Sequence, residues 1–161
     1  MTYHRGRTYY ENNVSLRMPD PMVIRRAPKS ADVAGDVNEW LTAALTREDV
    51  YYFSVFFGED LVGQILLHDI NWKSGEALVE YHLFQPGYRV RGIGTHALTI
   101  LQQFTAEQAK LKRLLIITTR DNPAAQRVAE KCGFTFIGAP REDPHALVFQ
   151  WNVPSSSGKA E

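Results

Sequence analysis

Short runs rich in β-branched and aromatic residues recur along the chain, and they predict strands. Each run is bounded by glycine, proline, asparagine or serine, which is typical of strands joined by turns. The runs occupy residues 22–27, 51–57, 61–70, 76–84, 113–119, 134–138 and 146–153.

Three other stretches carry apolar residues spaced three and four apart, the period of an amphipathic helix. The first covers about 32–46. The second follows the strand at 76–84, and its apolar face consists of Ile93, Ala97, Ile100 or Leu101, and Phe104. In the third, Asn122 is a suitable N-cap, Pro123 takes the first helical position and Gly133 ends the helix.

The connections between these elements predict the fold class. Turns at 58–60 and 71–75 link the strands from 51 to 84 into an antiparallel meander. The next connection contains a long helix, and such crossovers join parallel strands. We therefore expect a single α/β (α+β) domain. Its mixed, mostly antiparallel sheet of six to seven strands would contain one parallel pair, formed by 77–84 and 113–119.

Composition places the chain among ordinary globular proteins. It has 161 residues, of which 44% are hydrophobic and 22% charged, and its formal net charge is zero. A surface dedicated to nucleic acid would show a clustered basic excess, so we expect no nucleic-acid partner. We divide the chain into an N-terminal extension (1–21), in which prolines break any regular element, a domain (22–153) and a disordered tail (154–161).

The cysteine content and the hydropathy pattern indicate the cellular compartment. A single cysteine, Cys132, excludes an internal disulfide framework, and its spacing places it on the buried face of the short helix. No run of eighteen apolar residues and no apolar leader segment occurs, so we expect a cytoplasmic protein with no membrane partner. No group of histidine, cysteine or acidic residues has metal-site spacing.

A basic glycine loop before the second helix is the strongest candidate for a binding site. Gly92 and Gly94 allow close approach of a ligand to the backbone, and the first N–H groups of a helix carry partial positive charge. Arg89 and Arg91 add forked donors that suit phosphate oxygens. The loop therefore predicts a pyrophosphate site.

Two common phosphate-binding motifs fit this loop poorly. A dinucleotide-binding fingerprint requires a third glycine and an acidic residue about 20 residues on, whereas the next strand reaches an acid only at Asp121. A P-loop requires lysine after its last glycine, and here Thr95 and His96 follow.

The loop instead resembles a motif of the GNAT superfamily of acyl-CoA-dependent N-acetyltransferases. That motif, [QR]-x-x-G-x-[GA], corresponds to residues 89–94. A second match follows at the family's spacing, with R-D-N-P-A-A at 120–125 and E-K-C-G-F at 130–134. The resemblance covers roughly residues 22–151 and is closest to the branch that includes ribosomal-protein N-terminal acetyltransferases.

The resemblance implies a site for acetyl-CoA as co-substrate and no metal. In the family the parallel strands splay at a bulge, and the pantetheine arm lies along the first of them. Backbone contacts with pantetheine would then come from Leu83, Phe84 and Gln85, and Asn122 would face the cofactor from the other side. The pyrophosphate would be held by Arg89, Val90, Arg91, Gly92, Ile93, Gly94 and Thr95.

Catalytic candidates lie in the strand before the loop. Glu80 is the first candidate for the base and His82 could relay a proton, although this face of the strand could equally be exposed to solvent. Trp40 is either a core aromatic residue or an acceptor-side residue. Many family members have a tyrosine general acid in the third helix, and here Ala129 occupies that position.

The sequence leaves three function classes open. The first is an N-acetyltransferase acting on a small-molecule amine or a peptide amine. The second is a catalytically weak, coenzyme A-binding regulatory module, and the third is a nucleotide-binding module that shares only the glycine loop. A homodimer is compatible with all three.

Overall fold

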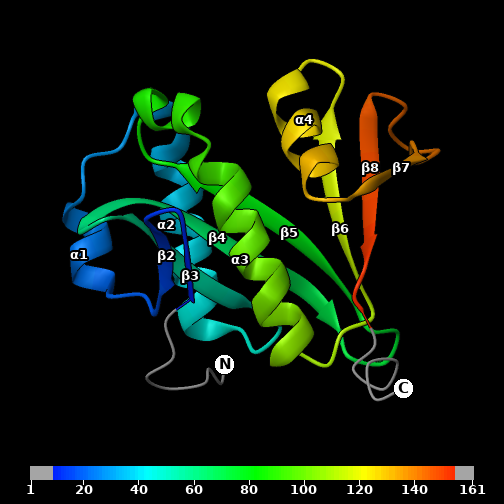
Figure 1. Ribbon diagram of the computed structural model, residues 1–161, viewed down its shortest axis with the longest axis horizontal. Helices are drawn as coiled ribbons and strands as arrows, with labels where there is room; N and C mark the ends of the chain where they lie inside the picture. Colours follow the sequence, from blue (N-terminus) through cyan, green and yellow to red (C-terminus); the bar gives the residue numbers. More distant parts are fainter. Residues whose placement is uncertain (1–8, 155–161) are drawn as a thin grey trace.

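The structure, a computed structural model, describes residues 9–154 and contains an eight-stranded mixed sheet with helices on both faces (Figure 1). The spatial order of the strands is β1-β2-β3-β4-β5-β6-β8-β7. The strands are β1 (Tyr9–Glu11), β2 (Val14–Arg17), β3 (Tyr51–Phe57), β4 (Asp60–Asn71), β5 (Glu76–Leu83), β6 (Arg113–Thr119), β7 (Thr135–Gly138) and β8 (Ala146–Asn152). The helices are α1 (Pro21–Arg26), α2 (Ala31–Thr46), α3 (Ile93–Glu107) and α4 (Pro123–Lys131), with a 3₁₀ turn, η1 (Pro86–Arg91).

The predicted parallel pair is confirmed as β5 and β6. Within the described chain, three residue pairs join these strands, from Glu76–Arg113 to Leu78–Leu115. An ion pair of 2.9 Å between Arg113 Nε and Glu76 Oε2 reinforces this short junction. Beyond it β6 pairs with β8 along its whole length, and β5 and β6 diverge towards α4 (Figure 1). The sheet is therefore split into two wings joined at one end.

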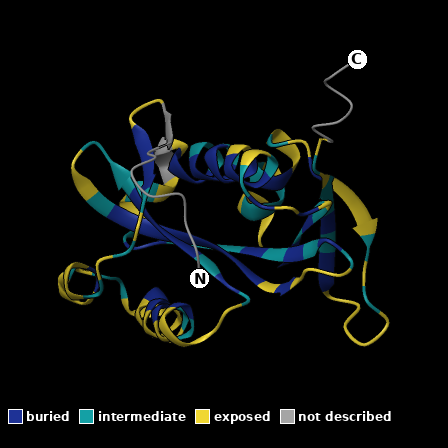
Figure 2. Ribbon diagram, turned by 90° about the horizontal axis from the view of Figure 1, so that it is seen from below, coloured by how far each residue is buried: buried dark blue, intermediate teal, exposed yellow. Residues whose placement is uncertain are grey.

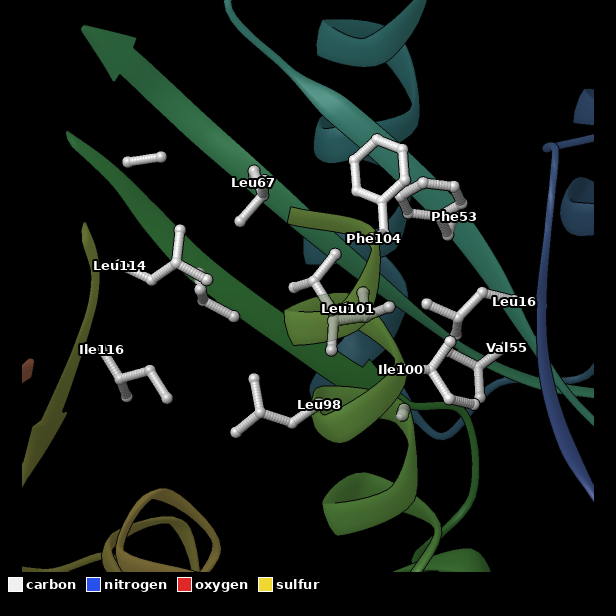
Figure 3. Packing of buried hydrophobic residues seen from close by; sticks show 14 of the residues in the cluster. Leu16, Phe53, Val55, Leu67, Leu98, Ile100, Leu101, Phe104, Leu114 and Ile116 are labelled. Carbon is white, nitrogen blue, oxygen red and sulfur yellow. The ribbon is translucent and has the colours of Figure 1, made fainter. Parts of the chain in front are cut away.

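A hydrophobic core lies on each face of the sheet. In Figure 2, which is coloured by burial, the buried residues of the strands lie between helices on the two faces. Helix α3 covers the larger core, in which Leu98, Ile100 and Leu101 are fully buried against the strands (Figure 3). The ring of Phe104 meets that of Phe53 edge to face, with centroids 4.9 Å apart. The apolar stripe predicted for this helix is thus its packing face.

Helix α2 covers a smaller core on the opposite face. The apolar residues Val33, Val37 and Leu41 pack there with Leu66 and Phe84 from the sheet. Because alternate residues of an extended chain point to opposite faces, Ala77, Val79 and Leu83 of β5 pack in the larger core, whereas Phe84, directly after β5, packs in the smaller one. The helix lies close to the predicted span of 32–46.

The expected strand at 22–27 was wrong, because this segment forms α1. Asp20 accepts hydrogen bonds from the N–H groups of Met22 and Val23, and Pro21 occupies the first turn. Of the apolar residues here only Ile24 is buried, whereas Met22 and Val23 are exposed. A capped helix start followed by one buried anchor outweighs the β propensity of the short run.

The expectation that residues 1–21 hold no regular element was also wrong. Residues 9–17 form the antiparallel hairpin of β1 and β2, and β2 pairs with β3 from Val14–Phe57 to Arg17–Ser54. Val14 and Leu16 are buried in the core under α3. This hairpin raises the strand number above the six to seven expected. The expected tail, apart from Pro154, lies outside the described residues.

The remaining strands and helices lie where the sequence predicted them, within one or two residues. The expected burial of Cys132 is supported, since this half-buried side chain packs against the larger core. Among residues 9–154, no helix has the length and apolar character needed to cross a membrane.

We predict that Leu101→Ala lowers the free energy of unfolding by about 2–5 kcal/mol, because it leaves a cavity in the core under α3. Leu45→Ala is the matched control, because Leu45 is 54% exposed on α2 and its truncation should change stability by less than about 0.5 kcal/mol. Urea denaturation measures both. Equal losses would contradict the assignment of the core.

Candidate active site

A cleft of about 720 Å³ occupies the opening between β5 and β6. Its lining comes from both diverging strands, from the glycine loop at the start of α3, from the beginning of α2 and from α4. The three-residue junction between β5 and β6 forms one end of the opening and α3 begins at the other.

The backbone of β5 forms one wall of this cleft. Phe84 donates its N–H to the carbonyl of Val62, so this residue bonds towards β4. The N–H and C=O groups of successive residues in a strand point alternately to the strands on either side. Counting back from Phe84, those of Val79, Tyr81 and Leu83 therefore point away from β4, towards the opening. In the described chain β6 pairs with β5 only up to Leu78, so these groups face the cleft.

The glycine loop lies at the wide end of the cleft. Gly92 adopts a left-handed conformation with φ of 72° and is the N-cap of α3. Gly92, Gly94 and Thr95 line the cleft, so the partly positive N–H groups at the start of α3 are next to it. Such an arrangement suits an anion.

Basic side chains surround this end of the cleft. Arg89 lines it and also forms an ion pair of 3.0 Å with Asp32 of α2. Arg127 and Lys131 of α4 line the opposite side. The sequence reasoning missed these two residues, although their spacing of four on one short helix was a usable signal.

The predicted cofactor residues fall into three groups. Those that line the cleft are Leu83, Arg89, Gly92, Gly94, Thr95 and Asn122, and the last also caps α4 by accepting from the N–H of Ala125. Phe84, Gln85 and Ile93 do not line it. The backbone of Phe84 is engaged by Val62 and Ser30, which does not support the expected pantetheine contact there. The side chains of Val90 and Arg91 lie outside the described part of the structure.

Glu80 lies on the wall of the cleft that faces α2, with a half-buried side chain. Its Oε2 accepts a hydrogen bond of 3.1 Å from the indole N–H of Trp40, and its Oε1 lies 3.5 Å from Nε2 of His68. The contact with His68 lowers the pKa of Glu80. The nearby Trp40 and His82 add to this shift, whereas burial opposes it. Glu80 is thus an ionised carboxylate at neutral pH.

His68 lies behind Glu80 and is itself buried. Its Nδ1 lies 2.5 Å from Oδ2 of Asp69, a residue with φ of 49° at an irregularity of the β4–β5 register. Burial opposes charging of the ring, but the contacts with Glu80 and Asp69 outweigh it and raise the pKa of His68. Trp40 covers the ring, with centroids 4.4 Å apart.

His82 lies on the other side of Glu80. Its Nε2 is 3.6 Å from Oε2 of Glu80 and 3.7 Å from Oδ2 of Asp36, and its Nδ1 is 3.0 Å from Nε2 of Gln64. Burial lowers the pKa of His82, although both carboxylates oppose the shift. Folding therefore shifts the pKa values of the two imidazoles beside Glu80 in opposite directions.

Of the two roles that the sequence left open for Trp40, the core role is supported, because Trp40 packs against the smaller core, and its indole N–H also donates to Glu80. Ala129 is fully buried and carries no proton donor. Tyr81 lines the cleft beside Gly94, and burial raises its pKa to about 12, so its phenol remains protonated. Among residues 9–154, no group of three histidine, cysteine or acidic side chains could hold a metal ion.

The cleft combines an anion-binding end, an unpaired strand edge and a carboxylate. An extended ligand with a phosphate end could bond along β5 and present its other end to Glu80. The carboxylate could then attract a cationic group and accept a proton from it.

Comparison with known proteins agrees with this geometry. The family model described as an acetyltransferase (GNAT) domain matches residues 10–135. No curated protein sequence matches the chain.

Solved acetyltransferases share the fold. A putative ribosomal-protein-serine acetyltransferase from Vibrio cholerae is 21% identical, with 92% of this chain and 98% of that chain covered and a TM-score of 0.68. RimL, a ribosomal L7/L12 alpha-N-protein acetyltransferase in complex with coenzyme A, is 17% identical, with 91% and 98% covered and a TM-score of 0.69. The spermidine N-acetyltransferase of Vibrio cholerae, in complex with CoA and spermine, is 15% identical, with 89% and 97% covered and a TM-score of 0.72. At these identities the likeness concerns the fold.

We predict that His68→Gln destabilises the protein more at about pH 6 than at about pH 9. A histidine whose pKa is raised by folding contributes stability that is fully present below its unfolded pKa of about 6.5 and is lost as the pH rises through the folded pKa. Urea denaturation at both pH values measures the difference. His145→Gln, at an exposed position, is the control, and an equal cost of His68→Gln at both pH values would contradict the raised pKa of His68.

Proposed function

Because the chain belongs to the family of acetyltransferase (GNAT) domains, we propose that it transfers an acetyl group from acetyl-CoA to a primary amine by direct attack in a ternary complex. The observation that carries this proposal is the cleft in which the unpaired edge of β5 leads to the N-terminus of α3. An acyl-CoA has a matching shape, with amide groups along its arm and a pyrophosphate beyond them.

In this proposal the pantetheine arm adds to the edge of β5 as a strand would. The backbone groups of Val79, Tyr81 and Leu83 that face the opening provide the partners. The pyrophosphate binds the N–H groups at the start of α3, with Arg89 nearby and Arg127 on the opposite wall. Asn122 lies on that opposite wall as well.

Glu80 accepts the proton that the acceptor must lose. The amine reaches the site as an ammonium ion, which the ionised Glu80 attracts. Only the deprotonated nitrogen can then attack the thioester carbon. The carbon–nitrogen bond forms and the carbon–sulfur bond breaks, and the nitrogen gives up its second proton to the leaving thiolate or to water as coenzyme A departs. Glu80 then releases its proton to solvent through the open side of the cleft.

The leaving thiolate has no partner at the position where many family members carry a tyrosine, because Ala129 is buried and apolar. A thiol with a pKa near 8.5 can leave as the thiolate when helix N–H groups stabilise it. Tyr81 is a protonated phenol that lines the cleft and can supply a proton instead. The inert Ala129 also favours one alternative, a catalytically weak module that binds coenzyme A for regulation.

The acceptor is proposed to be a small-molecule amine or a protein N-terminus. Structural neighbours named for acetylation of ribosomal protein and of spermidine support both kinds of primary amine. A screen of amines and N-terminal peptides, read out by the release of free thiol from acetyl-CoA, identifies the class.

Binding of acetyl-CoA is the first test. A ligand that binds only the native state stabilises it by about 2.7 kcal/mol when its concentration is 100 times the Kd, so the Tm must rise. ATP at the same concentration should leave the Tm unchanged. A rise with ATP but not with acetyl-CoA would favour a nucleotide-binding module and overturn the proposal.

We predict that Gly92→Val abolishes acetyl-CoA binding and leaves the fold largely intact. A side chain at this left-handed residue costs about 1–2 kcal/mol and occupies the space proposed for the pyrophosphate. Gly87→Val is the control, since a Cβ there meets nothing within 4 Å and Gly87 lies outside the cleft lining. Unchanged affinity in a folded Gly92 variant would remove the loop from the site.

We also predict that Glu80→Gln lowers kcat by about 100-fold or more while the Kd for acetyl-CoA changes by less than about threefold. The amide keeps the shape of the side chain but accepts no proton at neutral pH. Steady-state kinetics and calorimetry measure the two quantities. Equal losses in both, or an unchanged kcat, would exclude Glu80 as the base and favour the regulatory module.

A further inference from the structure

A buried chain of hydrogen bonds ends on His82 from the side opposite the cleft. We propose that Tyr52 and Gln64 are positioning residues that hold His82 as the neutral tautomer with its hydrogen on Nε2, so that it faces Glu80 as a donor. The catalytic role of this arrangement rests on the proposed function. The tautomer of His82 does not, because it is a property of the unliganded protein.

The chain starts at Tyr52 on β3, a fully buried residue. Its hydroxyl donates to Oε1 of Gln64 on β4 at 2.5 Å. Burial raises the pKa of Tyr52 well above its usual range, so the phenol keeps its proton and remains a donor. The side-chain amide of Gln64 is also fully buried, and its Oε1 end faces Tyr52.

The orientation of Gln64 then determines the tautomer of His82. With Oε1 towards Tyr52, Nε2 of Gln64 faces Nδ1 of His82 at 3.0 Å. An amide nitrogen donates and never accepts, so Nδ1 of His82 must be the unprotonated acceptor. The hydrogen of the neutral ring therefore lies on Nε2. Protonation of Nδ1 would place two donors against each other in a buried site, which adds to the effect of burial in keeping the ring neutral.

The Nε2–H group points to the acidic side of the cleft. Glu80 Oε2 lies 3.6 Å away on β5 and Asp36 Oδ2 lies 3.7 Å away on α2, and these are the charged groups described beside His82. Both distances are too long for a direct hydrogen bond and suit a bridging water. A donor in this place supports the ionised form of Glu80 and cannot take the proton of the acceptor at Nε2.

This assignment gives the two histidines beside Glu80 separate roles. His68 lies between two carboxylates that favour its charged form, whereas His82 is a neutral donor whose second nitrogen is occupied by Gln64. His82 was a candidate proton relay on sequence grounds, and the chain from Tyr52 argues against that use. Glu80 remains as the group in the cleft that is placed to accept a proton.

The nitrogen-15 NMR spectrum of the histidine rings in the full, unliganded chain tests the inference directly. The His82 signals are assigned by their loss in His82→Gln. At about pH 7 we expect a protonated Nε2 and an unprotonated, hydrogen-bonded Nδ1. A hydrogen on Nδ1, a mixture of tautomers or a charged ring would overturn the proposal. Since no acetyl-CoA is present, a failure of acetyl-CoA binding overturns the proposed function without changing this result.

Gln64→Glu tests the consequence for catalysis. A carboxylate at this position accepts from both neighbours, so it draws the hydrogen to Nδ1 of His82 and favours the charged ring. We expect kcat to fall at least about tenfold, with the Kd for acetyl-CoA within about twofold and the NMR signal moved to a protonated Nδ1. Gln102→Glu is the matched control, because this buried amide donates to the carbonyl of Cys132 on the other face of the sheet. An unchanged kcat in folded Gln64→Glu would overturn the proposal, and if that variant does not fold the wild-type spectrum decides.

Discussion

The short junction between β5 and β6 is the constraint on which the rest of the structure depends. Three residue pairs hold the two wings of the sheet together, and the ion pair of Arg113 with Glu76 strengthens their start. Past Leu78 the strands separate, which leaves strong hydrogen-bonding groups of the β5 backbone facing an opening instead of a neighbour. Backbone groups require partners, so the fold itself creates a place for a ligand with amide groups. A sheet closed along its length would have no such place.

Strand β5 serves two functions because its faces differ. Ala77, Val79 and Leu83 pack in the core under α3, which keeps the strand edge in position beside the cleft. Glu80 and His82 point to the other face, towards α2. A shift of register by one residue would exchange these sets, burying the carboxylate in the large core and exposing the apolar residues. The buried core therefore determines where the chemistry of the cleft lies.

Charge is separated along the cleft. The start of α3 and the side chains of Arg89, Arg127 and Lys131 make one end attractive to an anion, whereas Glu80, on the wall that faces α2, attracts a cation. The buried His68 and the half-buried His82 flank that carboxylate, and both lower its pKa, His68 the more strongly. The proposed ternary complex matches this separation of charge, with a phosphate-bearing donor and an ammonium-bearing acceptor in a single groove.

The sequence by itself determined the features that depend on local pattern. The periods of apolar residues located α2, α3, the meander and the parallel pair, and the glycine loop with its downstream match identified the family, which the family model confirms over residues 10–135. Tertiary structure decided what depends on neighbours distant in sequence. The hairpin at 9–17 joins the sheet only because β3 offers an edge. The start of α1 is different, because the Asp20 cap that replaces the expected strand is a local signal that the sequence reasoning missed. Glu80 was found from sequence, but its contacts with Trp40 and His68 come from α2 and β4. Local preference is a property of a few consecutive residues, whereas the charge of a side chain depends on register and packing, which only the folded chain sets.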